Sequence, residues 1–128
     1  MKAPKNLKYT NTHEWLEIDG SVAIIGITDH AQDALGDIVF IDLPQIGDEV
    51  ICGESFADVE SVKAVSEVIS PVSGTIIEVN EELLDSPEKV NEDAYGSWFI
   101  KVGDITEQEA DDMLYDENEY KEIIKSNE

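Results

Sequence analysis

The sequence contains no arginine, and its eight lysines face 30 aspartates and glutamates, which gives a net charge of −22. Nucleic-acid binders and anionic-membrane binders need basic side chains to neutralise phosphates, so both kinds of partner are excluded. A single cysteine, Cys52, excludes a disulfide framework. The longest apolar run, Val22 to Ile27, is far too short to span a bilayer.

Targeting signals are equally scarce. The first ten residues lack the apolar segment of a secretory signal peptide, and without arginine they do not resemble a mitochondrial transit peptide. We therefore expect a cytoplasmic protein, or a mitochondrial matrix protein if the chain is the processed form of an imported eukaryotic precursor.

Motifs for independent catalysis are also missing. His13 and His30 stand in unrelated contexts, and no second thiol is present to complete a zinc site. The chain has no phosphate-binding glycine loop and no GxSxG nucleophile motif. Carboxylates are so abundant that no pair of them indicates a catalytic site. We expect a protein that is not an enzyme and that holds no metal.

What is present predicts one mainly β domain over residues 1–128, a small sandwich or flattened barrel. Asp19-Gly20 lies between apolar stretches and predicts a type I′ hairpin. Thr28 predicts the N-cap of a short helix that ends at Gly36. Ser86-Pro87-Glu88 predicts the start of another helix, with Ser86 as its N-cap. Further strands are expected at residues 37–43, 75–79 and 97–102.

The C-terminal part, about residues 106–125, is expected to be helical. Thr106 to Glu109 and Asp116 to Glu119 both have the spacing of capping boxes. Tyr120, with Ile123 and Ile124, forms a narrow apolar stripe. The stripe favours a helix packed on the parent sheet, with a partner-binding helix as the alternative.

Lys63 is the only lysine between Lys8 and Lys89. It lies between two extended segments, which predicts a position at a hairpin tip. Its neighbours Val62 and Ala64 are small, so a modifying enzyme could approach the amine closely. A tip lysine that receives a long acyl arm becomes a swinging group carrier. The alternative at this point is an ordinary exposed lysine.

Residues 60–80, ESVKAVSEVISPVSGTIIEVN, resemble the lipoyl-attachment hairpin of the glycine cleavage H-protein family. The resemblance extends from Leu7 to about Lys125 and includes HEW at 13–15 and GITDHAQDALGDIVFIDLP at 26–44. Biotin carriers typically frame their lysine with methionines, whereas Val62 and Ala64 take those places here.

The resemblance implies a lipoyl/biotinyl-type barrel-sandwich hybrid with short peripheral helices and a helical C-terminal tail. It implies a non-catalytic carrier with lipoate in amide linkage on Lys63. The implied partners are a pyridoxal-phosphate glycine decarboxylase, a folate-dependent aminomethyltransferase, dihydrolipoamide dehydrogenase and the enzymes that attach lipoate.

The resemblance also implies a pocket for the amine of the loaded arm, at Thr12, Glu14 and Glu67. Family members commonly carry serine and aspartate where Thr12 and Glu67 stand, so both positions keep their polar type with altered reach. Two other functions remain open. One is a lipoyl relay or carrier for another lipoate-dependent pathway; the other, of a different class, is an unmodified structural interaction domain.

Overall fold

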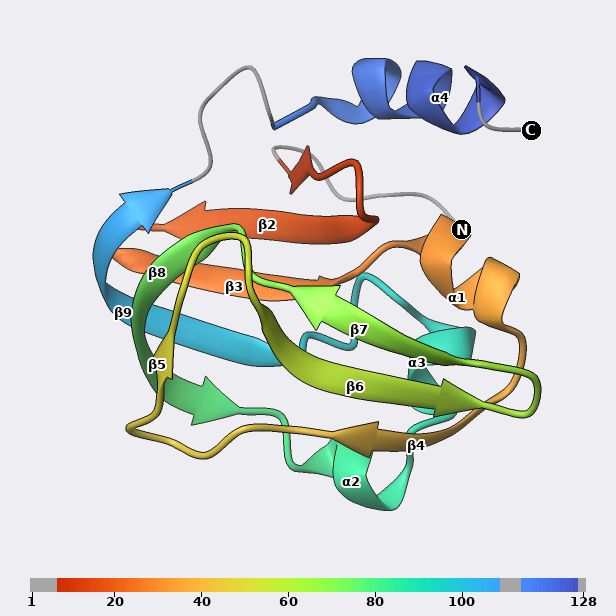
Figure 1. The fold of residues 1–128 in the computed structure, drawn as a ribbon, viewed down its shortest axis with the longest axis horizontal. Helices are drawn as coiled ribbons and strands as arrows, with labels where there is room; N and C mark the ends of the chain where they lie inside the picture. The colour runs from red at the N-terminus through yellow and green to blue at the C-terminus, as the bar shows by residue number, and fades with distance from the viewer. Residues whose placement is uncertain (1–6, 109–113, 127–128) are drawn as a thin grey trace.

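The computed structural model describes residues 7–108 and 114–126, and it consists mainly of two antiparallel β-sheets (Figure 1). The larger sheet has the order β1-β2-β3-β9-β8-β5 and the smaller one the order β4-β6-β7. The six strands of the larger sheet are β1 (Lys8–Tyr9), β2 (Glu14–Asp19), β3 (Val22–Ile27), β9 (Ile100–Gln108), β8 (Val72–Val79) and β5 (Glu49–Val50). The smaller sheet comprises β4 (Ile38–Asp42), β6 (Ser55–Ser61) and β7 (Val65–Ile69). The expectation of a mainly β protein is confirmed.

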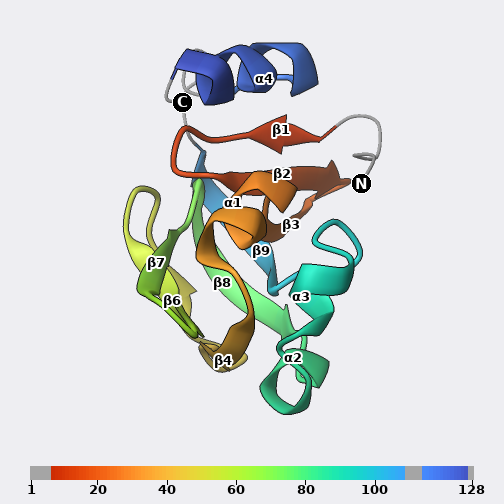
Figure 2. The same ribbon diagram turned by 90° about the vertical axis from the view of Figure 1, so that its right-hand side faces the viewer.

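The helices lie at the periphery of the sheets. They are α1 (Asp29–Leu35), α2 (Glu82–Asp85), α3 (Lys89–Glu92) and α4 (Glu117–Ser126). Helix α4 lies over β1 at one end of the molecule (Figure 1), and α1 lies beside α3 (Figure 2). Within the described ranges, no helix is both long and apolar enough to cross a bilayer.

The core lies between the two sheets and takes apolar side chains from both. In β6, Ala57 and Val59 are buried while Asp58 and Glu60 between them are exposed. This alternation follows from the period of two in a strand that faces a core on one side only. It fixes which side of the smaller sheet faces solvent, and it also places Ser61, at the end of β6, on the buried side.

The first hairpin forms as predicted, but its turn type differs. Asp19 pairs with Val22, so the two-residue loop consists of Gly20 and Ser21. Gly20 has a φ of 64°, whereas Ser21 has no positive φ. A positive φ at the first loop residue alone is the signature of a type II′ turn, so the predicted type I′ turn is wrong. Asp19 belongs to the strand and not to the loop.

The predicted helix start at Thr106 is wrong, because residues 106–108 belong to β9. This strand begins at Ile100, three residues later than expected, and pairs with β8 as far as Val72 opposite Gln108. Pairing along the whole of β8 outweighs the local capping pattern. The remainder of that pattern, at 109–113, lies outside the described residues.

The second capping box is confirmed at the start of α4. The Asp116 backbone N–H donates to the Glu119 carboxylate at 3.0 Å, and the Glu119 N–H donates to the Asp116 carboxylate at 2.8 Å. Tyr120 is buried, which confirms a helix packed on the parent fold. The expected cap at Ser86 is wrong: α3 begins at Lys89, whose N–H donates to the Ser86 carbonyl in a preceding turn.

Candidate functional site

Lys63 is exposed at the tip of the β6–β7 hairpin, which projects from the right-hand side of Figure 1. Neither Val62 nor Lys63 has a positive φ, so the turn is not of the primed type that tight hairpins favour. The Ser61 side chain closes it instead. Its hydroxyl oxygen accepts from the N–H groups of Lys63 and Ala64, at 3.3 and 3.1 Å. The Ser61 N–H donates to the Ala64 carbonyl at 2.8 Å.

The tip is also tied to the segment that follows α1. The Val62 N–H donates to the Asp37 carbonyl at 3.0 Å. Gly36, with a φ of 81°, ends α1 beside the Lys63 stem, and a Cβ there would lie 3.3 Å from Lys63 Cε. Asn91 on α3 holds this corner, since its amide donates to the Gly36 carbonyl and its Oδ1 accepts from the Ile38 N–H, each at 2.9 Å. The lysine therefore projects from a supported turn.

Carboxylates line the solvent face of the lysine-bearing sheet. Asp58 on β6 stands directly opposite Asp42 on β4 and directly opposite Glu67 on β7, and all three side chains are exposed. Glu60, also exposed, lies on the same face nearer Lys63. Like charges directly opposite each other destabilise a sheet, so folding stability does not explain this row. This row of carboxylates creates a strongly negative electrostatic environment near Lys63.

Glu14 is one of the most buried charged side chains, with 1% of its surface exposed. Its Oε1 accepts hydrogen bonds from the hydroxyl of Thr10, at 2.6 Å, and from the hydroxyl of Thr12. Its Oε2 accepts from the Ile69 N–H at 3.2 Å. Burial raises the pKa of Glu14 above its ordinary value, and these hydrogen bonds oppose part of that rise.

Three of the four predicted residues converge on strand β7. Lys63 stands just before it, Glu67 lies within it, and Glu14 binds its last residue, Ile69. At about 3.3 Å per residue, Glu67 is about 13 Å along the strand from Lys63 and Ile69 is about 20 Å from it. Thr12 and Glu14 are in direct contact, whereas Glu67 is exposed and makes no hydrogen bond to either of them within the described chain.

His13, between Thr12 and Glu14, is held in the left-handed region with a φ of 72°. Its N–H donates to the Thr10 carbonyl at 3.1 Å, and its carbonyl accepts from the Thr28 N–H at 3.0 Å. The Tyr120 hydroxyl lies 2.6 Å from His13 Nδ1 and 2.7 Å from Thr28 Oγ1. Burial lowers the pKa of His13, and the neighbouring His30 ring lowers it further. Helix α4 therefore holds the backbone corner that presents Thr12 and Glu14.

Several of these supporting residues could not be found from the sequence. Thr10, Ser61 and Asn91 are ordinary polar residues whose hydrogen-bond partners become clear only in the fold.

Cys52 is half-buried, and its thiol donates to the Pro71 carbonyl at 3.4 Å. In the part of the chain that the structure describes, no group of three or more His, Cys, Asp or Glu side chains could hold a metal ion.

Comparison with known proteins finds close similarity along nearly the whole chain. The family model described as glycine cleavage H-protein matches residues 7–127. The glycine cleavage system H protein of Lachnoclostridium phytofermentans is 56% identical over 126 residues, covering 98% of this chain and 97% of that protein. The probable glycine cleavage system H protein of Pyrococcus abyssi is 53% identical over 127 residues, covering 98% and 94%.

A solved structure matches the fold. The crystal structure of a glycine cleavage system H protein from Mycobacterium marinum superposes with a TM-score of 0.83 at 38% identity, covering 97% of this chain and 98% of the other. The predicted fold class, a lipoyl-type barrel-sandwich hybrid, is thereby confirmed.

Proposed function

Because the chain belongs to the glycine cleavage H-protein family, we propose that it carries lipoate on Lys63 and shuttles the aminomethyl group of glycine within the glycine cleavage system. The observation that carries the proposal is the position of Lys63 at the exposed tip of a hairpin that Ser61 and Asp37 hold in place. As proposed, residues 1–128 act as one carrier domain without catalytic groups of its own.

The residues around the tip fit a lipoyl amide. The Lys63 side chain is exposed, and Gly36 leaves room for its methylene stem. When bound, lipoate supplies a dithiolane that accepts the aminomethyl group and is later returned to its oxidised form. The chain contributes position: a rigid turn presents one amine, and no second lysine competes between Lys8 and Lys89.

The proposed partners follow from the successive tasks of such a carrier. A pyridoxal-phosphate glycine decarboxylase loads it, a folate-dependent aminomethyltransferase unloads it, and dihydrolipoamide dehydrogenase reoxidises it. A lipoate-attaching enzyme modifies Lys63. Each visit is brief, and the negative row formed by Asp42, Asp58 and Glu67 favours fast association with basic partner surfaces. The proposed location is the cytoplasm, or the mitochondrial matrix for a processed eukaryotic form.

The distance along β7 is compatible with an arm that returns to the protein. About eleven bonds separate Lys63 Cα from the lipoyl ring, a reach of about 13 Å at about 1.2 Å per bond. That length matches the separation along the strand between Lys63 and Glu67, about 13 Å. The amine of a loaded arm, a few bonds further out, would then reach toward Ile69, whose N–H donates to the Glu14 carboxylate.

Thr12, Glu14 and Glu67 are proposed to hold that amine in its protonated form. A nearby carboxylate favours an ammonium over the neutral amine. A protonated nitrogen has no lone pair with which to expel the sulfur, so the aminomethyl group is retained. The ammonium in turn favours the ionised form of Glu14, whereas burial by itself raises the pKa of this side chain and favours the neutral form. The pocket and the loaded arm therefore stabilise each other's charged forms.

The test is glycine-dependent reduction of the lipoylated protein by its purified partners. We expect dithiol to appear rapidly only when glycine, decarboxylase, aminomethyltransferase and folate are all present, because spontaneous hydrolysis of the loaded protein is much slower. Lys63→Arg keeps the charge at the tip but cannot form the same amide, so it should fold normally and remain inactive. A lipoylated protein that no glycine-dependent step reduces would contradict the glycine cleavage assignment.

A further inference from the structure

Thr10 lies in the corner between β1 and β2, against the carboxylate of Glu14. It is buried, with 6% of its surface exposed, whereas Thr12, which binds the same carboxylate oxygen, is exposed. The resemblance to the H-protein family implies a pocket at Thr12, Glu14 and Glu67 and gives Thr10 no part in it. With almost no surface to offer a ligand, Thr10 can affect the pocket only through Glu14.

Thr10 binds Glu14 at three points. Its hydroxyl donates to Glu14 Oε1 at 2.6 Å, and the same hydroxyl oxygen accepts from the Glu14 backbone N–H at 3.0 Å. The Thr10 backbone N–H donates to the Glu14 carbonyl, also at 3.0 Å. One hydroxyl therefore joins the backbone of Glu14 to its own carboxylate and fixes the direction in which the carboxylate points.

The hydrogen-bond donors around this carboxylate favour its charged form. Glu14 is 1% exposed, and a buried carboxylate is unstable as an anion unless donors or a cation replace the lost water. Its Oε1 accepts from the hydroxyls of Thr10 and Thr12, and its Oε2 accepts from the Ile69 N–H. Burial raises the pKa of Glu14, and the hydrogen bond from Thr10 opposes that rise more than any other contact does.

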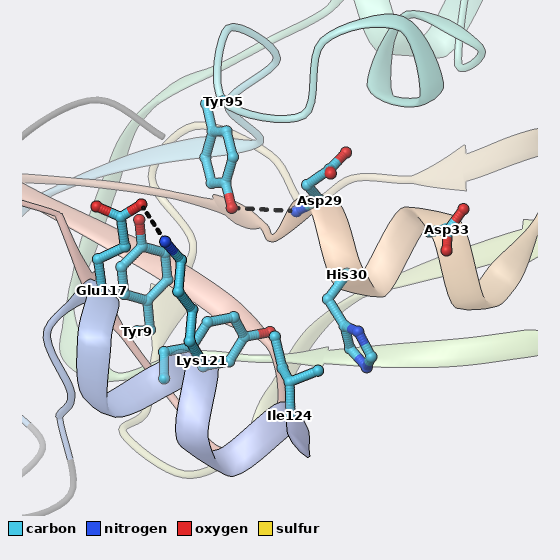
Figure 3. Close-up of a pocket in the computed structure, with 9 residues that line it drawn as sticks. Tyr9, Asp29, His30, Asp33, Tyr95, Glu117, Lys121 and Ile124 are labelled. Atoms are coloured by element: carbon cyan, nitrogen blue, oxygen red, sulfur yellow. Dashed lines mark hydrogen bonds and ion pairs between the residues drawn. The ribbon is translucent and has the colours of Figure 1, made fainter. Parts of the chain in front are cut away.

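Within residues 7–108 and 114–126, no cation forms an ion pair with Glu14. On α4, Lys121 pairs with Glu117 at 3.5 Å, and both line a cavity between α4 and α1 to which Glu14 does not contribute (Figure 3). The other titratable groups near the corner are not hydrogen-bonded to Glu14 either; they are His13, His30 on α1, Tyr120 on α4 and Glu67 on β7. Hydrogen-bond donors, and Thr10 first among them, therefore stabilise the charge of Glu14.

We infer that Thr10 is a positioning residue: it aligns the Glu14 carboxylate and holds it in the ionised form, ready for the ammonium of a loaded arm. This role rests on the protection of the arm that is proposed above for Glu14. Thr12 lies at the surface, where an arm can touch it, so the two threonines have different tasks. Without the Thr10 hydroxyl, the carboxylate loses a donor and the neutral carboxyl persists to a higher pH. A neutral carboxyl no longer attracts the ammonium.

The first test is a ¹³C NMR titration of the Glu14 carboxyl carbon in the full-length protein without lipoate. Thr10→Val keeps nearly the same shape and removes the hydroxyl, so the titration midpoint should rise by about one to two pH units. Thr10→Ser restores the donor and should return the midpoint toward the wild-type value. The control is Ser97→Ala, which removes a different buried hydroxyl, one that donates to the Lys89 carbonyl at 3.1 Å, and should leave the midpoint unchanged. An unchanged midpoint in Thr10→Val would overturn the inference.

A second NMR readout needs no substitution and so does not depend on whether Thr10→Val folds. In the wild type, the Thr10 hydroxyl proton should exchange slowly with water, and its resonance should shift with the same midpoint as the Glu14 carboxyl carbon. A hydroxyl proton that exchanges too fast to be observed, or that does not respond to the titration of Glu14, would contradict the inference.

The second test measures ammonia release from the lipoylated, loaded protein as a function of pH. The pH below which the release rate reaches that of Glu14→Gln should be higher for Thr10→Val than for wild type. In the Glu14→Gln background, Thr10→Val should add no further acceleration. Acceleration in that background too would show that Thr10 acts independently of the Glu14 charge, and it would overturn the inference. If Glu14→Gln itself releases ammonia at the wild-type rate, the protective function fails and the role of Thr10 in it fails as well, while the NMR midpoints still measure the effect of Thr10 on the charge.

Discussion

Replacing Glu14 by glutamine tests the proposed protection of the loaded arm. The amide has nearly the same shape, and its carbonyl oxygen can still accept from Thr10 and Thr12. It removes the negative charge and turns an NH₂ group toward the Ile69 N–H, which loses its acceptor. The substitution therefore removes the attraction to an ammonium while it changes the packing little.

The size of the effect follows from the burial of Glu14. At an effective dielectric constant of about 20, an ammonium about 4 Å from a carboxylate gains about 4 kcal/mol, before the cost of leaving water. Hydrogen bonds to charged groups keep about 1.5–3 kcal/mol after that cost. Since about 1.4 kcal/mol is a factor of ten, the loaded Glu14→Gln protein should release ammonia about 10 to 150 times faster.

The assay follows spontaneous hydrolysis of the loaded protein to ammonia, formaldehyde and free dithiol. Lipoylated protein is loaded with glycine by the decarboxylase, separated from it, and sampled for ammonia over time. Glu17→Gln, the same chemical change on the same strand, is the matched control and should release ammonia at the wild-type rate. Equal release rates from wild type and Glu14→Gln would refute the protective role.

Three further predictions concern stability and association. Tyr120→Phe removes the hydroxyl shared by His13 and Thr28, so the free energy of unfolding in urea should fall by about 1–3 kcal/mol. Tyr115→Phe, a half-buried control, should change it by less than about 0.5 kcal/mol. Because burial raises the pKa of Glu14, the protonated carboxyl stabilises the fold. The difference in melting temperature, wild type minus Glu14→Gln, should therefore be greatest below about pH 4, the pKa of glutamate in the unfolded chain. It should shrink as the pH rises through the pKa of Glu14 in the folded protein. A difference that grows with pH would contradict this. Association rates with the partner enzymes, measured by stopped flow, should fall steeply with salt; rates that do not change with salt would exclude electrostatic steering.

The fold was predictable wherever the pattern was local. Lys63 lies between two extended segments, and this local pattern predicted its position at the tip of a hairpin. The role of Thr28 as an N-cap could be predicted from the neighbouring residues alone. Its hydroxyl accepts a hydrogen bond from the Ala31 N–H at 3.1 Å, as expected for an N-cap. The error at residues 106–108 has the opposite cause, since pairing with a strand some 30 residues away outweighs a local capping pattern.

The pocket was not predictable by the same means. Glu14 is one of 30 acidic residues, and nothing near it in sequence reveals that it is buried. Its contact with Ile69 spans 55 residues, and the contact of His13 with Tyr120 spans 107. Only the resemblance to a family placed Thr12 and Glu14 together. The role of α4 in holding their backbone needed the three-dimensional fold.

The central claim is that Lys63 carries lipoate. Its most direct test is the intact mass of protein purified from its native, lipoate-replete host, followed by peptide mapping. We predict one lipoyl increment, located on Lys63 and absent from the Lys63→Arg variant expressed in the same cells. An unmodified native protein, or an increment on any other lysine, would contradict the account.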